Sequence, residues 1–295
     1  MKDEPLVSVV IATYNMGQYL PDAVESVLNQ HWKNLEVIVV DDGSEDNTAE
    51  SISRFNDDAR FRYVRTANQG QPKAKNRGLA ESKGEFIGFC DADDLWHPDK
   101  LKLQMPLFKD SSVGVVYSEV SYIDELGMLI DKPKPYYRYS GKVTNHLVIK
   151  NFIPFGTALI RRACMTKDGV FDESLPMGID WDLWLRYSLN WEFKYNPEKT
   201  YAYRLWSGQM SHNYRGRYDN AIKILTKFLM KYPDAIPGSV ISRAWADIYV
   251  CRAMEIAKSE RTFREPFIDL MHGIKHDWLN ILAWKAMAKL VLRRI

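Results

Sequence analysis

Cysteine, long apolar runs and a charge of one sign are all scarce in this 295-residue sequence. Its three cysteines, Cys90, Cys164 and Cys251, form no CxxC pair, which argues against a disulfide framework or a zinc site and fits a reducing compartment. No window approaches the roughly 20 apolar residues that a membrane-spanning helix needs. The formal net charge is only +2, so nucleic acid is not expected as a partner.

Glycine-rich phosphate loops and an apolar leader are also missing. The sequence contains neither GxGxxG nor GxxxxGK, which disfavours a dinucleotide-binding fold and a P-loop ATPase. The first residues, MKDEP, lack the apolar segment of a signal peptide. We therefore expect a cytoplasmic protein, either soluble or lying on the inner face of the cell membrane.

What the sequence does contain is an alternation of apolar runs and amphipathic segments up to residue 90. The apolar runs predict strands at 6–12, 35–40, 61–65 and 86–90, and the amphipathic segments predict helices at 18–30, 46–55 and 72–83. Such alternation indicates βαβ units and a mostly parallel sheet flanked by helices, and 46% apolar residues can fill its core.

The pattern changes after residue 95. We predict helices at 97–109 and 144–151 and from Asp180, and strands at 113–117, 120–123, 156–161, 191–195 and 200–204. Residues 132–139 are expected to form a loop that either connects elements at the surface or contacts an acceptor. Four helices are predicted at 215–232, 238–258, 263–274 and 277–294. The expected division is an α/β domain over 1–212, with halves 1–95 and 96–212, and a helical extension over 213–295.

Polar clusters follow three of the predicted strands: Thr13-Tyr14-Asn15, Asp41-Asp42 and Asp91-Ala92-Asp93. The carboxyl ends of parallel strands meet at one edge of a sheet, where ligands of α/β proteins gather. Neighbouring carboxylates repel unless a cation or hydrogen bonds compensate, and Mg²⁺ or Mn²⁺ suits such oxygen ligands. The alternative is an acidic turn in which Asp94 caps a following helix.

A second acidic cluster begins the helix predicted from Asp180. Asp180 and Asp182 lie in its first turn, where the helix dipole favours carboxylates. Asp182 is equally well explained as a capping residue. Asp180, at the helix start, is the better candidate for a catalytic base.

The last predicted helix is basic and amphipathic. It carries Lys285, Lys289 and Arg293 at a spacing of four, together with Trp278 and Trp284. A helix of this kind can lie on an anionic membrane. The alternative is a packing helix with a solvated basic face.

Several segments resemble family 2 glycosyltransferases of the GT-A fold, in order and spacing as well as in sequence. They are VSVVIATYN (7–15), VIVVDDGSEDNT (37–48), NQG (68–70), AKNRG (74–78) and DADD (91–94). The resemblance covers roughly residues 5–212 and is specific for fold and reaction class, but not for the sugar or the acceptor.

The resemblance implies a nucleotide-diphosphate sugar donor, for which we expect a UDP-sugar, and a divalent ion, Mn²⁺ or Mg²⁺, bound by Asp93. The nucleotide-binding residues that it implies are Thr13, Tyr14, Asn15, Asp42, Gly70, Lys75, Asn76, Asp91 and Ala92. Asp42 would accept a hydrogen bond from the edge of the base, such as uracil N3–H.

Asp180 matches the catalytic aspartate of the family, which implies an inverting displacement on the sugar. A hexose or an N-acetylhexosamine would pass to a hydroxyl of a glycan or glycolipid, in bacterial surface polysaccharide or lipid-linked oligosaccharide synthesis. Asp182 and His212 are secondary candidates for the site.

Three positions depart from the family pattern. Lys75 stands where arginine is common, Ile179 replaces the usual glutamate, and Trp206 occupies a place where many members have histidine. The Gln-x-x-Arg-Trp motif of processive synthases is missing, which favours the addition of a single sugar. An inactive nucleotide-sugar-binding scaffold and a nucleotidyltransferase remain as alternatives.

Overall fold

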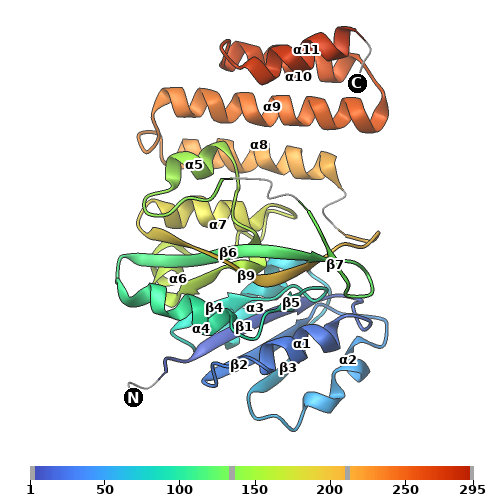
Figure 1. Ribbon diagram of the computed structural model, residues 1–295, viewed down its shortest axis with the longest axis vertical. Coiled ribbons are helices and arrows are strands. Elements are labelled where there is room, and N and C mark those ends of the chain that lie inside the picture. The colour runs from blue at the N-terminus through green and yellow to red at the C-terminus, as the bar shows by residue number, and fades with distance from the viewer. Residues whose placement is uncertain (1–3, 133–136, 210–212, 293–295) are drawn as a thin grey trace. The chain divides into compact units, whose positions relative to one another are not determined.

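The computed structural model describes residues 4–132, 137–209 and 213–292 (Figure 1). The chain forms two compact units. The first comprises Met1–Val143 and Phe152–Ser207, and the second comprises Thr144–Asn151 and Gly208–Ile295. Helix α5 (Thr144–Ile149), which lies within the first domain of the division predicted from the sequence, belongs to the second unit because it packs against a helix of that unit.

The first unit is built on a curled sheet in the order β3-β2-β1-β4-β8-β6-β9-β5, with β7 paired to β6. The strands are β1 (Val7–Thr13), β2 (Leu35–Asp41), β3 (Phe61–Arg65), β4 (Phe86–Phe89), β5 (Leu95–Trp96), β6 (Val113–Ile123), β7 (Leu129–Ile130), β8 (Leu159–Arg161) and β9 (Glu192–Arg204). The first four in chain order are mutually parallel, whereas β8 runs antiparallel to β4 and β6. The predicted α/β class is confirmed, but the sheet as a whole is mixed rather than mostly parallel, because the parallel pairs of β1 to β4 are joined to strands with antiparallel pairs.

Two strands are longer than the sequence indicated. Residues 113–117 and 120–123 form one strand, β6, and residues 192–204 form one strand, β9. The register between β6 and β9 shifts on both sides of Glu119, so the polar residues that suggested a break lie at bulges within continuous strands. Pro197 is tolerated in β9 at the same irregularity.

Short helices cover the sheet of the first unit. They are α1 (Leu20–Leu28), α2 (Thr48–Ser51), α3 (Gln71–Glu81), α4 (Lys100–Gln104), α6 (Arg162–Asp168) and α7 (Ile179–Ser188), with 3-10 turns at Ser53–Phe55, Met105–Lys109 and Phe155–Thr157. The helix expected at 97–109 is thus α4 followed by a 3-10 turn, with Pro106 near the start of that turn. The apolar face of α1 packs into the same core as β1 and β2.

The second unit is helical, as predicted. It contains α5 and four further helices, α8 (Tyr214–Lys231), α9 (Gly238–Glu260), α10 (Arg264–His276) and α11 (Ile281–Val291). Figure 1 shows α9 between α8 and the pair formed by α10 and α11. Ala253, Ala257, Ala283 and Ala286 contribute to the core of α9, α10 and α11, where small side chains allow the helices to approach closely.

Candidate active site

The loops after β1 and β2 are fastened to each other. Thr13 pairs in register with Asp41, so the two strands end at the same level. Asn15, held at φ 53, donates its backbone N–H to Ser44 Oγ at 2.8 Å, and its Oδ1 accepts the backbone N–H of Glu45 at 2.8 Å. The predicted convergence of these two strand ends is therefore present, and hydrogen bonds join their loops.

The side chains at the end of β1 differ in exposure. Tyr14 is 43% exposed, and the Thr13 side chain is buried. Thr13 Oγ1 has no hydrogen-bond partner within the part of the chain that the structure describes. A buried hydroxyl without a partner costs free energy, so a polar ligand atom at this position would be favoured.

Asp42 holds the loop that leads into α3. Its two carboxylate oxygens accept the backbone N–H groups of Gln69 (2.9 Å) and Gly70 (2.8 Å). Gly70 has φ 95, a conformation that strains residues with a side chain. A carboxylate offers about four lone-pair positions, so Asp42 retains capacity for a further donor such as a nucleobase N–H.

The loop after β4 contains three carboxylates, and each of them has a bonding partner elsewhere in the chain. Lys75 Nζ lies 2.9 Å from Asp91 Oδ1 and 4.1 Å from the centre of the Phe155 ring, and its side chain is only 3% exposed. Asp94 accepts hydrogen bonds from the Tyr201 hydroxyl (2.8 Å) and the Arg204 backbone N–H (2.7 Å). It is followed by β5 rather than a helix, so the alternative capping role for Asp94 is wrong.

The Tyr201 ring packs against Gly156, and its hydroxyl bonds to the loop after β4. A side chain at Gly156 would place its Cβ 2.0 Å from the Tyr201 ring, so only glycine fits there. The Tyr201 hydroxyl also accepts the backbone N–H of Asp91 at 3.2 Å. Burial, with the charges of Asp93 and Asp91, raises the pKa of Asp94 well above its usual value.

Asp93 is bonded to β9 and to the residues that follow it. The Trp206 indole N–H donates to Asp93 Oδ2 at 2.7 Å, and Arg204 Nε–H donates to the Asp93 backbone carbonyl at 2.8 Å. Burial and the neighbouring charge of Asp91 raise the pKa of Asp93. A divalent cation beside Asp93 would offset both effects, so the residues fit the predicted metal.

The protein ligands alone do not complete a metal site. Over residues 4–132, 137–209 and 213–292, no group of three or more His, Cys, Asp or Glu side chains is arranged to hold an ion. Mg²⁺ and similar ions are often held by one or two carboxylates together with substrate phosphates. A cation at Asp93 would therefore share its coordination with a phosphate-bearing ligand.

The second acidic cluster separates into two different environments. Helix α7 begins at Ile179 after Gly178, which has φ 72, and Asp180 is half-buried in its first turn. Asp182 is buried, and its Oδ2 accepts from Arg186 Nη2 (2.8 Å) and Nε (3.0 Å).

The Asn76 side-chain amide bonds the backbone N–H and carbonyl of Phe171, and so it fastens α3 to the loop that precedes α7. His212 lies outside the described residues. Sequence reasoning missed the contributions of Tyr201 and Arg204, and it noted Trp206 only as a departure from the family pattern.

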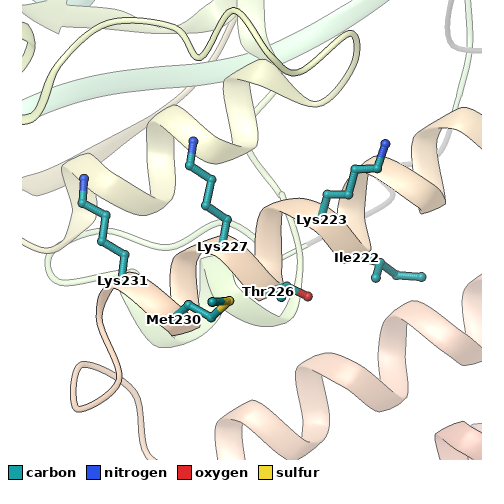
Figure 2. A pocket seen from close by; sticks show the side chains of 6 residues that line it. All are labelled: Ile222, Lys223, Thr226, Lys227, Met230 and Lys231. Carbon is teal, nitrogen blue, oxygen red and sulfur yellow. The ribbon is translucent and has the colours of Figure 1, made fainter.

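A groove on α8 is unrelated to these residues. It has a volume of about 550 Å³ and is lined by Ile222, Lys223, Thr226, Lys227, Met230 and Lys231. Figure 2 shows the three lysines extending from one side of α8. None of the residues predicted to bind donor or metal lines this groove.

The fold has clear counterparts among solved structures. Staphylococcus aureus TarS 1–349 in complex with UDP-GlcNAc superimposes with a TM-score of 0.71 at 17% identity, covering 97% of this chain and 88% of that one. A mannosyltransferase from Pyrobaculum calidifontis, in complex with GDP-Man and Mn²⁺, gives a TM-score of 0.61 at 18% identity, covering 98% and 86%. These likenesses define the class of fold as GT-A, as the sequence predicted.

The sequence match is more specific. The family model described as glycosyl transferase family 2 matches residues 8–166, more than half of the chain. The chain therefore belongs to glycosyl transferase family 2, and the prediction of a glycosyltransferase is confirmed at the level of the family.

Curated relatives are longer than this chain. An uncharacterized glycosyltransferase of Rickettsia typhi is 34% identical over 188 residues, which is 62% of this chain and 58% of the relative. A chondroitin synthase of Escherichia coli is 35% identical over 198 residues, 66% of this chain and 28% of the relative. Among the helices described for this chain, none has the length and apolar character to cross a membrane.

Proposed function

We propose that the chain transfers a single sugar, with inversion, from a UDP-sugar to a hydroxyl of a glycan or glycolipid, and that it uses Mn²⁺ or Mg²⁺. The observation that carries the proposal is the position of Asp42, Asp91 and Asp93 in the loops at the carboxyl ends of β2 and β4, the two parallel strands that flank β1. The structural likeness to TarS, which was solved with UDP-GlcNAc, supports the choice of donor.

The loops after β1 and β2 are the proposed nucleotide site. The buried Thr13 hydroxyl can bond a polar atom of the nucleotide, and the exposed Tyr14 ring can stack on a base. The donor-binding role is proposed for Thr13, Tyr14, Asn15, Asp42, Gly70, Lys75, Asn76, Asp91 and Ala92. Because Asn15, Asn76 and Lys75 are bonded to other protein groups, we propose that within this set they shape the site.

Asp93 is the proposed metal ligand. Trp206 holds Oδ2 of Asp93, and Lys75 holds Oδ1 of Asp91, so both carboxylates are oriented before a ligand arrives. A bound divalent ion would neutralise the negative charge that develops on the departing diphosphate. Because Lys75 is almost fully buried, solvent screens its charge only weakly, and the charge stabilises the Asp91 carboxylate in the loop after β4.

Asp180 is the proposed general base. Its carboxylate takes the proton of the acceptor hydroxyl as the oxygen attacks the anomeric carbon, and the nucleoside diphosphate leaves from the opposite face. One such displacement inverts the anomeric configuration. Asp182 is less suited to this role because Arg186 occupies one of its oxygens in a buried ion pair.

The distribution of charge supports action at a membrane surface. The helical unit has 16 Lys and Arg residues against 8 Asp and Glu, whereas the first unit has 24 against 30. We propose that the acceptor belongs to surface polysaccharide or lipid-linked oligosaccharide synthesis and is used at the cytoplasmic face of the membrane. Residues 277–295 are the proposed region of contact.

Release of UDP from UDP-sugars tests the proposed reaction. We expect turnover of at least one of UDP-glucose, UDP-galactose and their N-acetyl forms with Mn²⁺, and its loss with a chelator. If the chain binds nucleotide but turns over none of these donors, the proposed enzymatic activity is wrong and the chain is a binding scaffold. If the chelator leaves turnover unchanged, the reaction does not require a metal ion.

A further inference from the structure

Helix α11 has two faces of opposite environment, although both are largely apolar. Ala283, Ala286, Met287 and Leu290 are buried in the core of the helical unit. The outer face carries Ile281, Trp284, Val291 and Leu292, which are between 52% and 68% exposed. The burial pattern therefore leaves four large apolar side chains exposed on the face where an ordinary surface helix carries polar ones.

The exposed apolar residues form a continuous stripe. At 100° per residue, Ile281, Trp284, Ala288, Val291 and Leu292 fall within an arc of about 100°. Trp278 and Leu279, in the turn before the helix, are 71% and 67% exposed and add to the exposed apolar surface of this segment. Contiguous exposed apolar surface of this kind marks a site of interaction with a protein or a membrane.

Charge and aromatic content favour a membrane over a protein. Lys285 and Lys289 are exposed and follow the apolar stripe along one of its edges. The Trp284 indole N–H donates to the Trp278 carbonyl at 2.8 Å, so the two tryptophans lie in one ordered segment. Tryptophan beside lysine, on a helix with an apolar face, is the composition of helices that lie in the headgroup layer of anionic bilayers.

We propose that the outer face of α11, together with Trp278 and Leu279, inserts into the headgroup layer of an anionic lipid bilayer. The proposal rests on the proposed function only because a lipid-linked acceptor would explain why the chain binds a membrane. In this proposal the apolar stripe of α11 inserts into the bilayer, and Lys285 and Lys289 add electrostatic attraction to the anionic lipids. The lysine row of α8 is a separate surface and is not part of it.

Binding of the full chain to vesicles, measured by flotation without any nucleotide-sugar, tests the proposal. Phosphatidylcholine vesicles with phosphatidylglycerol should bind the protein, and the double variant Ile281→Glu, Trp284→Glu should bind at least tenfold less. Both positions are exposed, so folding should be preserved, and circular dichroism checks this. The matched control is Leu126→Glu, Leu129→Glu, because these residues of the first unit are 88% and 78% exposed.

A second pair of variants separates charge from insertion. Lys285→Gln, Lys289→Gln should weaken binding several-fold, and more than Lys223→Gln, Lys227→Gln on α8 does. Equal vesicle binding by wild type and the Ile281→Glu, Trp284→Glu variant would overturn the proposal. So would a doubled mass in solution that this variant abolishes while vesicle binding persists, because a second copy of the chain would then cover the stripe. Since UDP release is measured apart from vesicle binding, failure of the proposed function is recognised separately.

Discussion

The two units of the chain use polar and apolar residues in opposite ways. In the first unit, carboxylates at the sheet edge are bonded to groups far along the chain, as Asp93 is to Trp206 and Asp94 to Tyr201. In the helical unit, ion pairs join neighbouring helices, for example Arg252 of α9 and Asp269 of α10, and helix α11 exposes apolar side chains. The first unit carries an excess of acidic residues, and the second an excess of basic ones.

This contrast indicates a division of labour. Acidic groups that are buried and oriented before a ligand arrives suit the binding of a metal–diphosphate and proton transfer. A basic unit with an apolar outer face suits attachment to an anionic surface. If the division is correct, substitutions in one unit should change its own property and leave that of the other unchanged.

The largest effect is expected for Asp180→Asn. Loss of the proposed general base should lower UDP release by about a hundredfold to ten-thousandfold, because asparagine cannot accept the acceptor proton. Binding of UDP and of vesicles should be unchanged, as measured by calorimetry and flotation. Full turnover in this variant would contradict the assignment of the base.

Asp182→Asn should instead affect stability. Its carboxylate is buried with Arg186, and removal of one partner of a buried ion pair costs about 3 kcal/mol. Urea unfolding of the first unit should report this loss, while the activity that remains at low temperature should stay near that of the wild type. A stable variant with no turnover would transfer the catalytic role from Asp180 to Asp182.

Trp206→Phe should weaken Mn²⁺ binding about tenfold, because Asp93 loses the hydrogen bond that orients it. Electron paramagnetic resonance of Mn²⁺ in the presence of UDP measures this affinity without catalysis. Trp284→Phe in the helical unit is the matched control and should leave the affinity unchanged. An unaltered Mn²⁺ affinity in the Trp206→Phe variant would contradict the assignment of Asp93 as the metal ligand.

The smallest effect concerns the acid stability of the helical unit. Hydrogen bonds from Arg215, at 2.6 Å, and from Tyr214 lower the pKa of Glu260 from 4.5 to about 2. Because the folded pKa is depressed, the stabilisation is present above pH 4.5 and is lost as the pH falls toward 2. Glu260→Gln should flatten this dependence in unfolding curves, whereas Asp234→Asn, at an exposed position in the turn after α8, should not.

Local patterns were sufficient to predict the fold of the first half. Apolar runs separated by amphipathic segments predicted β1 to β4 and the helices α1 and α3, because each of these elements is specified within a few residues. The helix expected at 46–55 is instead the four-residue α2 followed by a 3-10 turn at Ser53–Phe55. The helical unit was equally visible from periodicity and from the prolines between its helices. The sequence predicts breaks within β6 and β9, because a bulge in a continuous strand and a polar break between two strands have the same residue pattern.

The bonds within the candidate site could not be predicted in the same way. Asp93 and Trp206 are 113 residues apart, and Asp94 and Tyr201 are 107 apart, so no spacing rule relates them. The sequence did predict which carboxylates would share a sheet edge, because parallel strands determine that. It could not distinguish Asp180 from Asp182 by environment, since only the folded chain shows the ion pair of Asp182 with Arg186.

A thermal-shift screen of UDP, GDP, dTDP and CDP, each with and without Mn²⁺, tests the central claim most directly. A ligand that binds only the folded state raises its stability with the logarithm of the ligand excess over Kd. We predict a shift of several degrees with UDP that requires Mn²⁺ and is lost in Asp93→Ala. A chain that shifts with no nucleotide, or shifts with UDP equally well without metal and in Asp93→Ala, would contradict a metal-dependent UDP-sugar site at the end of β4.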